Sequence, residues 1–356
     1  MFARVSLSIA FASLALAVAG CDQGGTVVPD TAPDASAAAG AKPYADTCAL
    51  CHGAAGEGYA ADGAPALASS TFLATATDDF LARAVARGRP GTTMSAWDQA
   101  HAGPYDAGAI ASLVAFLRTW QTTPSVDADA VVVRGDPSRG APLFAAQCSI
   151  CHGATGTEGP YVRLANPELL AAASDGFLRY AIEHGRPGSP MSAFAGMLTA
   201  QDMDDVVSTI RSWQTPVTEG DAGDIPIPGT AGPVLLNPGG PDPGFVLGQR
   251  YTPADTVKYE LDQGAAMVIL DARAPSDYTA GHVAGAIDLP FYEVSSYFDV
   301  LPRDRWIVCY CACPHAESGR AADALTQHGF TQVTIIDEGF YVWRDRGYPV
   351  HMGALP

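Results

Sequence analysis

The stretch Cys48-Ala49-Leu50-Cys51-His52-Gly53 has a second copy in this chain, Cys148-Ser149-Ile150-Cys151-His152-Gly153. Residues three and four apart on a helix lie on the same face. The two cysteines of each copy, with the histidine that follows them, can therefore approach one flat ligand together. The sequence therefore predicts two helices, each of which carries one copy of this motif.

The repetition extends well beyond the two motifs. Gly40 and Tyr44 upstream of the first motif are matched by Gly140 and Phe144 upstream of the second. Further blocks match in the same order: Gly88-Arg89-Pro90-Gly91-Thr92-Thr93-Met94-Ser95-Ala96-Trp97 with Gly185-Arg186-Pro187-Gly188-Ser189-Pro190-Met191-Ser192-Ala193-Phe194, and Leu117-Arg118-Thr119-Trp120-Gln121 with Ile210-Arg211-Ser212-Trp213-Gln214. Matched blocks in one order indicate a duplicated domain.

Cys-x-x-Cys-His is the pattern by which haem c is attached covalently. Cys48, Cys51, Cys148 and Cys151 are the predicted attachment cysteines of two haems. A Cys-x-x-Cys pair alone could also be a redox dithiol or half of a zinc site. Those sites need a βαβ context or a second Cys-x-x-Cys, whereas each motif here has its own downstream methionine.

Each haem iron needs a second axial ligand, and the repeat suggests a methionine. The predicted iron ligands are His52 and Met94 in the first unit, and His152 and Met191 in the second. The competitors are His101 in the first unit and His184 or Met197 in the second, but none has an equivalent in the other unit. Histidine with methionine raises the reduction potential of haem and favours electron transfer over catalysis at iron.

Residues 40–121 and 140–214 resemble class I cytochrome c domains in these motifs. The resemblance implies two all-α domains in which the first and last helices cross near the haem edge. Tyr44 or Phe144 would contact Leu117 or Ile210 there. Arg89 and Arg186 are either partners of the haem propionates or solvated arginines of a turn.

The beginning of the chain reads as an export signal. Arg4 precedes an apolar run that ends at Val18-Ala19-Gly20-Cys21, which is the pattern of a secretory signal. It resembles the lipobox of bacterial lipoproteins, which implies a lipidated Cys21; the alternative is a cleaved signal with an unrelated cysteine. A lipid on Cys21 would anchor the protein to a bacterial membrane, in the periplasm or at the cell surface, without a spanning helix.

The C-terminal third changes to an α/β pattern. Thr252-Pro253 suggests a helix start, with the helix ending at Asp262. Strands are expected over Met267–Leu270, from Trp306 and over Gln332–Ile336, and helices over Arg320–His328 and near Tyr341–Trp343. Buried apolar runs that alternate with helices indicate an α/β domain.

Asp271-Ala272-Arg273, Asp277-Tyr278, Gly281-His282-Val283-Ala284-Gly285-Ala286-Ile287, Leu289-Pro290, His328-Gly329-Phe330 and Glu338-Gly339-Phe340 resemble the rhodanese superfamily. The resemblance covers about residues 251–352 and implies a small α/β domain with a parallel sheet. It also implies an active cysteine where a strand meets the N-terminus of a helix, which holds sulfur as a persulfide. The implied site residues are Cys311, Cys313, Arg320 and Asp271.

The loop from Cys311 to Arg320 is longer than is usual in that superfamily. Cys311 fits the nucleophile position best, but Cys313 is a rival. The pair could instead form a disulfide or bind a metal. Glu317 would oppose a dianionic donor unless its side chain points outward. Cys309 is expected to be buried packing.

The predicted organisation is therefore multidomain: two all-α cytochrome c domains followed by an α/β rhodanese-like domain. The ranges are 1–21 (signal), 22–39 (flexible tether), 40–121 (first cytochrome c domain), 122–138 (linker), 139–214 (second domain), 215–245 (Gly- and Pro-rich linker) and 246–356 (rhodanese-like domain).

The net charge of −18 argues against nucleic acid as a partner. The expected partners are redox proteins of the respiratory chain and a small sulfur-containing anion. The expected function is electron transfer through two haems, combined with sulfur chemistry at a cysteine. The alternatives are an electron shuttle with a silent rhodanese module used for docking, and a redox sensor based on Cys309, Cys311 and Cys313.

Overall fold

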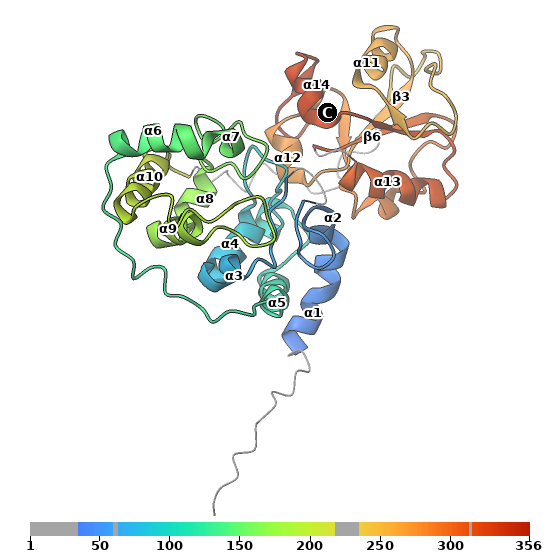
Figure 1. Cartoon of the computed structure of the whole chain (residues 1–356). Coiled ribbons are helices and arrows are strands. Elements are labelled where there is room, and N and C mark those ends of the chain that lie inside the picture. The colour runs from blue at the N-terminus through green and yellow to red at the C-terminus, as the bar shows by residue number, and fades with distance from the viewer. Residues whose placement is uncertain (1–34, 60–62, 218–234, 313–314) are drawn as a thin grey trace, which may run out of the picture. The chain divides into compact units, whose positions relative to one another are not determined.

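The computed structural model describes residues 35–59, 63–217, 235–312 and 315–356 (Figure 1). The predicted signal with Cys21, most of the predicted tether, and Cys313 lie outside the described residues. All described residues belong to one compact unit, which contains two helical domains and one α/β domain.

The first helical domain contains short helices around a deep core. Its elements are α1 (Ala35–Pro43), η1 (Tyr44–Cys48), α2 (Ala49–His52), α3 (Ser70–Thr75), α4 (Asp78–Arg87), η2 (Gln99–His101) and α5 (Ala107–Arg118). Helix α1 begins at Ala35, within the range predicted as tether. Alanine is the strongest helix former, and Ala37 is buried, so this alanine-rich stretch belongs to the fold.

Helix α1 crosses α5 closely, and glycine permits the approach. A Cβ atom on Gly40 would lie 2.0 Å from the carbonyl oxygen of Ser112 on α5. One turn later, the Tyr44 ring packs on Phe116 and Trp120, with centroid distances of 5.3 and 5.0 Å. The contact predicted between Tyr44 and the last helix is therefore made mainly by two aromatic side chains beside Leu117.

The second helical domain repeats this arrangement. Its elements are α6 (Pro137–Gln147), α7 (Ser149–His152), α8 (Pro167–Ala172), α9 (Asp175–His184) and α10 (Ala200–Ser212). Helix α6 begins two residues before the predicted domain boundary, because Asp136 caps it by accepting a hydrogen bond from Ser138 N. Phe144 packs edge-on against Trp213 at 4.9 Å, the counterpart of Tyr44 with Trp120.

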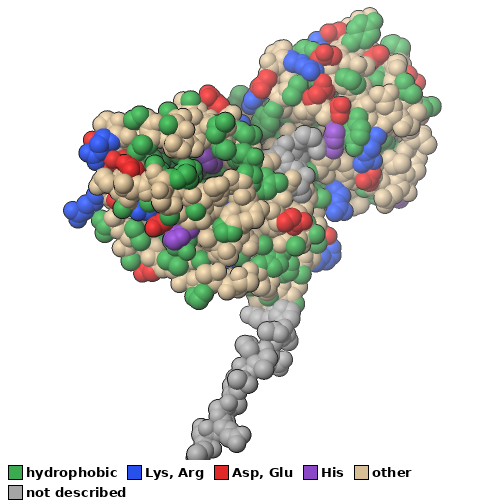
Figure 2. Space-filling model, viewed as in Figure 1, with side chains coloured by type: hydrophobic (Ala, Val, Ile, Leu, Met, Phe, Trp, Pro, Cys, Tyr) green, Lys and Arg blue, Asp and Glu red, His purple; other side chains and the backbone are tan. Residues whose placement is uncertain are grey.

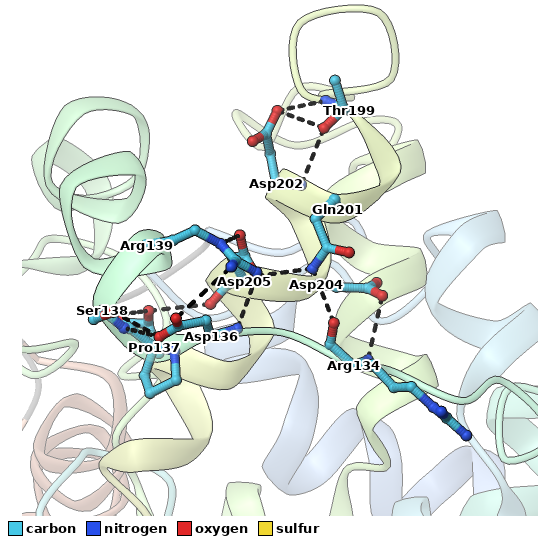
Figure 3. A network of polar contacts seen from close by, with 11 residues as sticks. Arg134, Asp136, Pro137, Ser138, Arg139, Thr199, Gln201, Asp202, Asp204 and Asp205 are labelled. Atoms are coloured by element: carbon cyan, nitrogen blue, oxygen red, sulfur yellow. Dashed lines mark hydrogen bonds and ion pairs between the residues drawn. The ribbon is translucent and has the colours of Figure 1, made fainter.

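A polar network fastens α6 to α10 in the second domain (Figure 3). Arg139 donates two hydrogen bonds to Asp205, at 2.8 and 2.9 Å, and the backbone N–H of Asp136 donates a third at 2.7 Å. The Asp205 side chain is only 3% exposed. These donors, the Arg139 side chain foremost, hold the pKa of the Asp205 carboxyl well below its usual range. The network therefore favours the folded state wherever Asp205 is ionised.

The segment predicted as a linker between the helical domains is packed against them. Val126 N donates to the carbonyl oxygen of Ala74 in the first domain. Ala128 is buried, and its carbonyl oxygen lies 1.8 Å from the position a Cβ atom would take on Gly176 of α9. The two domains also meet directly, since Arg83 pairs with buried Glu168 at 2.8 Å.

The α/β domain is built on a six-stranded sheet with the strand order β1-β3-β6-β7-β2 and β5 also beside β3. The strands are β1 (Leu235–Leu236), β2 (Tyr251–Thr252), β3 (Met267–Asp271), β5 (Ala286–Asp288), β6 (Trp306–Tyr310) and β7 (Val333–Ile336). All pairs are parallel except β1 with β3. Strands β4 (His282–Val283) and β8 (Val350–His351) form a separate antiparallel pair.

Helices cover the sheet, as Figure 1 shows for α11 and α13 near β3 and β6. They are α11 (Ala254–Asp262), α12 (Pro275–Ala280), η4 (Val294–Tyr297), α13 (Ala316–Gln327) and α14 (Gly339–Asp345). Every residue of β3 and β6 is buried. This confirms the prediction of a parallel sheet with covered faces.

Three local expectations about this domain were wrong. Strand β1 lies inside the range 215–245 predicted as a linker, because Leu235 and Leu236 pair with β3 and extend the sheet. Thr252 does not cap α11; it lies in β2, and its hydroxyl hydrogen-bonds to that of Thr334 at 2.8 Å. Helix α13 begins at Ala316, one turn earlier than the predicted start at Arg320.

Candidate functional site

One cavity of about 800 Å³ contains both Cys-x-x-Cys-His motifs. The predicted attachment cysteines and iron ligands of both helical domains all line it: Cys48, Cys51, His52, Met94, Cys148, Cys151, His152 and Met191. Its volume lies within the range of cofactor pockets. The structure therefore brings together the eight residues that the duplicated motif singled out.

Local helix geometry directs each motif into this cavity. Helices α2 and α7 end at His52 and His152, and Gly53 and Gly153 follow with φ of +81° and +76°. Such angles suit glycine and turn the chain away directly after the histidine. Cys48 lies one helical turn before His52, and Cys148 one turn before His152, so each lies on the same side of the helix as the imidazole.

Each histidine ring is oriented by a backbone carbonyl. Nδ1 of His52 donates to the carbonyl oxygen of Pro65, and Nδ1 of His152 to that of Val162, both at 2.9 Å. Burial lowers the pKa of both imidazoles, so the neutral form is favoured. A neutral imidazole with Nδ1 occupied presents Nε2 for a metal.

The competing axial ligands lie elsewhere. His101 is held by Asp98 through Nδ1 at 2.5 Å. His184 stacks on Tyr180, with a centroid distance of 4.1 Å, and Met197 is 62% exposed. Among the described residues, the methionines that line the cavity are Met94 and Met191.

Arg89 and Arg186 also line the cavity, one from each helical domain. Arg89 lies over the Phe80 ring at 5.5 Å and Arg186 over the Phe177 ring at 5.0 Å. Burial lowers the pKa of each guanidinium to about 10. Neither forms an ion pair with a carboxylate within the described part of the chain. Two desolvated cations in a cofactor cavity suit the propionates of a haem.

These features fit haem c. Thiols at the required spacing, a pre-oriented imidazole, a thioether and a half-buried arginine are present in each half of the cavity. Their equivalent placement in the two domains supports one haem in each.

The candidate sulfur site lies where β6 meets α13. Cys311 follows the last residue of β6 and is 1% exposed. Its Sγ lies 3.2 Å from Oγ of Ser318, on the first turn of α13. The N-terminal turn of a helix carries partial positive charge, so this position favours an anionic sulfur. Cys309 is fully buried within β6, as predicted.

Three other residues were predicted for the sulfur site: Asp271, Arg320 and Cys313. Asp271 is fully buried; it accepts hydrogen bonds from Arg273 at 2.6 Å and from the Tyr310 hydroxyl at 2.6 Å. The hydrogen bond between Tyr310 and Asp271 joins β6 to β3. Arg320 lies on the exposed side of α13. Cys313 is outside the described residues, so its role stays a prediction.

Sequence reasoning left the direction of the Glu317 side chain open and missed Asp288. Glu317 is 7% exposed and lines the same cavity as the haem motifs, together with Tyr341. Its direction depends on where α13 begins, and the predicted start was too late. Asp288 at the end of β5 is buried, and both its carboxyl oxygens lack a hydrogen-bond partner in the described structure.

The loop that carries Met94 touches the α/β domain. The hydroxyl of buried Ser95 donates to Oδ2 of Asp277 on α12 at 2.5 Å. Trp97 packs against Phe291 and Tyr292, with centroid distances of 6.3 and 6.2 Å. The first haem site therefore adjoins the α/β domain through direct contacts.

Two further observations concern the helices and the distribution of charged side chains. Within the described ranges, no helix has both the length and the apolar character needed to cross a membrane. Charged side chains on the face seen in Figure 2 are scattered among hydrophobic and uncharged ones.

Comparison with known proteins divides the chain in the same way. The family described as cytochrome c oxidase, cbb3-type, subunit III matches residues 35–116 and 135–208, and the rhodanese-like domain family matches residues 253–346. Thiosulfate sulfurtransferase GlpE of Pseudomonas putida is 32% identical over 99 residues, 27% of this chain and 84% of that protein.

A second curated relative is an HTH-type transcriptional regulator of Mycobacterium tuberculosis. It is 33% identical over 88 residues, which are 25% of this chain and 39% of the regulator. Among solved structures, the rhodanese-like domain of an Anabaena protein is 30% identical, with a TM-score of 0.28, and the match covers 30% of this chain and 81% of that one.

Cytochrome c domains of this type bind haem c covalently, transfer electrons between redox partners and are usually exported to the periplasm. A rhodanese-like domain brings sulfurtransferase-like function. The chain belongs to both families: residues 35–208 carry two cytochrome c domains of the cbb3-type subunit III family, and residues 253–346 are a rhodanese-like domain.

Proposed function

We propose that this protein is an exported dihaem c-type cytochrome that transfers electrons and accepts sulfane sulfur on Cys311. The observation that carries the proposal is the single cavity lined by two equivalent sets of two cysteines, a histidine and a methionine, and also by Glu317 of the rhodanese-like domain. Each haem, when bound, supplies one iron that stores one electron.

The chain's own residues prepare each haem site. The carbonyl oxygens of Pro65 and Val162 fix the two imidazoles. Met94 and Met191 would complete the donor sets, and thioether donors would raise the reduction potential of the bound haems. Such donor sets would favour electron transfer over catalysis at iron.

Aromatic side chains of the two helical domains meet in the cavity. The tilted rings of Phe80 in the first domain and Phe177 in the second have a centroid distance of 4.9 Å, and both line the cavity. An apolar lining of this kind lowers the local dielectric constant, so charge inside the cavity is weakly screened. Two sites in one cavity support electron transfer from one half of the protein to the other.

The sulfur chemistry rests on Cys311. Its thiol lies at the N-terminal turn of α13, beside the Ser318 hydroxyl, where a persulfide anion would be stabilised. The rhodanese-like domain would hold one sulfur atom there before passing it on.

The amino-terminal pattern bears on location, and the two kinds of domain bear on partners. A signal that ends at Cys21 supports a lipid anchor that places the protein at a bacterial membrane, facing the periplasm or the cell surface. Redox proteins of the respiratory chain are the proposed electron partners, and a small sulfur-containing anion is the proposed ligand of the rhodanese-like domain.

The test of electron transfer is a redox titration of the full chain, followed by haem absorbance. We expect two one-electron components. Met94→Leu should lower the potential of one component and Met191→Leu that of the other, because each removes a thioether ligand. A titration that neither variant changes would refute the ligand assignment.

A second function has one observation in its favour. The contacts of Ser95 with Asp277 and of Trp97 with Phe291 suit a rhodanese-like module used only for docking. Sulfurtransferase assays of the wild type and Cys311→Ser with several donors separate the two functions. Equal inactivity of both proteins would favour the docking role.

A further inference from the structure

The two loops that carry the predicted axial methionines have similar sequences but different surroundings. Met94-Ser95-Ala96-Trp97 and Met191-Ser192-Ala193-Phe194 occupy equivalent places in the duplicated domains. All three residues after Met94 are buried, whereas the serine and the alanine after Met191 are exposed and the phenylalanine is half-buried. The difference therefore comes from what lies against each loop.

The backbone contacts inside each helical domain are matched between the two loops. The carbonyl oxygen of Met94 accepts a hydrogen bond from Arg89 N at 2.7 Å, and that of Met191 accepts one from Arg186 N at 2.9 Å. Each methionine N–H also donates to a hydroxyl two residues earlier, at 3.1 and 3.2 Å. These contacts do not distinguish the loops.

The contacts that differ come from the rhodanese-like domain. The hydroxyl of Ser95, which is 2% exposed, donates to Oδ2 of Asp277 on α12 at 2.5 Å. Trp97 packs against Phe291 and Tyr292, with centroid distances of 6.3 and 6.2 Å. Ser192, the counterpart of Ser95, is exposed instead. The rhodanese-like domain therefore supports the loop of the first haem site at two points.

The hydrogen bond from Ser95 does not depend on the charge of Asp277. Burial raises the pKa of the Asp277 carboxyl, while Arg273 and the Ser95 hydroxyl lower it. Oδ2 can accept the hydrogen bond when the carboxyl is ionised, and also when the proton is on the other oxygen. The contact is therefore available in either protonation state.

These contacts make movement of the Met94 loop more costly than movement of the Met191 loop. For a bound thioether to be replaced by another ligand, the loop that carries it has to open, and opening costs the contacts that it breaks. Opening of the Met94 loop breaks the buried hydrogen bond to Asp277 and the aromatic contacts of Trp97. These contacts add to the ones that both loops share.

We propose that the rhodanese-like domain braces the Met94 loop, with Asp277 as a positioning residue, so that Met94 is displaced from iron less readily than Met191. This inference rests on the methionine ligands of the proposed function and adds a difference between two sites that the duplication makes equivalent. A change at α12 should reach the first haem site and leave the second unchanged.

The experiment titrates the ferric, haem-loaded full chain with imidazole, which competes with methionine for the iron. Loss of the weak charge-transfer band of methionine-bound ferric haem measures the displacement. Met191→Leu leaves the first site as the source of this band, and Met94→Leu leaves the second. We expect half-displacement at the first site to need about tenfold more imidazole than at the second.

Variants at Asp277 test its part in this difference. In the Met191→Leu background, Asp277→Ala removes the acceptor and should lower the imidazole concentration for half-displacement by about threefold to tenfold, the effect of one buried hydrogen bond. Asp277→Asn keeps an amide oxygen as acceptor and should retain most of the wild-type value. In the Met94→Leu background, Asp277→Ala should change nothing.

The matched control is Asp304→Ala. It removes a carboxyl from an exposed position of the same domain and should leave both titrations unchanged. An effect of Asp304→Ala as large as that of Asp277→Ala would show that the charge of the domain, and not the contact with Ser95, controls the displacement.

The outcomes separate the inference from the proposed function. If neither background shows the charge-transfer band, the methionine ligands of the proposed function fail. If the band is present and both sites release methionine at equal imidazole, or if Asp277→Ala affects both sites alike or neither, the inference is overturned while the ligands stand. Should Asp277→Ala fail to fold, Ser95→Ala removes the same hydrogen bond from the other side and decides.

Discussion

At the scale of single residues, Arg89 and Arg186 are two half-buried cations that line the cavity of the haem motifs. Burial lowers the pKa of both guanidinium groups, to about 10, yet they remain charged at neutral pH. A positive charge close to a haem stabilises the reduced iron relative to the oxidised iron. We therefore expect each arginine to raise the potential of a haem bound in its own domain.

Replacing either arginine tests this role. Arg89→Gln should lower the potential of one haem by about 60 mV, the equivalent of ~1.4 kcal/mol for one electron. Arg186→Gln should do the same to the other haem. Potentiometric titration measures both. Arg89→Lys keeps the charge and should keep most of the potential; equal falls in Lys and Gln variants would exclude a role of charge.

Asp205 links stability to pH. Its pKa is depressed in the folded state, chiefly by Arg139. The stabilisation is thus complete above the unfolded pKa, near 3.9, and is lost as pH falls from there towards the folded pKa.

Asp205→Asn should destabilise the second cytochrome c domain at pH 7 by about 1–3 kcal/mol, because buried donors of the network lose their acceptor. Calorimetry of the full chain at pH 7 and at more acidic pH checks this. The difference from wild type should shrink below pH ~3.9. Asp129→Asn, at an exposed position, is the control and should change nothing.

The site residues that could be predicted from the sequence are those that the duplication repeats. Met94 and Met191 stood out because they occupy equivalent places, and both line the cavity. Glu317 and Asp288 have no repeated counterpart. Their burial depends on where α13 begins and on the register of β5 with β3, which are tertiary properties.

At the scale of elements, the crossings of α1 with α5 and of α6 with α10 hold each cytochrome c domain together. Gly140 allows the second crossing as Gly40 allows the first, since a Cβ atom on Gly140 would lie 2.0 Å from the Asp205 carbonyl oxygen. The close crossing of the two helices explains why the repeated pattern has a glycine at the same place, Gly40 and Gly140, in both domains.

Gly40→Ala and Gly140→Ala should each destabilise one domain by about 1–3 kcal/mol, because the backbones must separate. Gly108→Ala is the matched control. It lies at an exposed position of α5 and should stabilise by up to ~1 kcal/mol through helix propensity. Chemical denaturation followed by circular dichroism distinguishes these cases. A neutral effect of Gly40→Ala would contradict the close crossing.

Long apolar runs made β3 and β6 predictable from the sequence. Amino-acid composition, in contrast, predicted the wrong boundaries for the domains. The alanine-rich start of α1 resembled a tether, but Ala37 packs in the core. The two-residue strand β1 lay inside a Gly- and Pro-rich range and gains its order only by pairing with β3.

At the scale of the whole molecule, the loop that carries Met94 contacts the rhodanese-like domain, and no sequence pattern predicts this contact. Phe291→Ala removes the ring that faces Trp97. An aromatic pair contributes about 0.5–1.5 kcal/mol beyond its area. Calorimetry should show the α/β transition separating from that of the first cytochrome c domain.

Phe298→Ala is the control for that separation. Phe298 stacks on His328 within the rhodanese-like domain, at 4.0 Å. It should lower the stability of this domain without changing its coupling to the cytochrome c domain. Identical calorimetric profiles for the two variants would show that the contact with Trp97 contributes nothing.

The central claim is that this one chain holds two haems, each bound by its own pair of cysteines. The most direct measurement is the intact mass of the mature protein after expression with a working haem maturation system. The account predicts two covalent haem adducts for the wild type, and one for the variant with Cys148→Ala and Cys151→Ala. A wild-type protein with one adduct or none would contradict it.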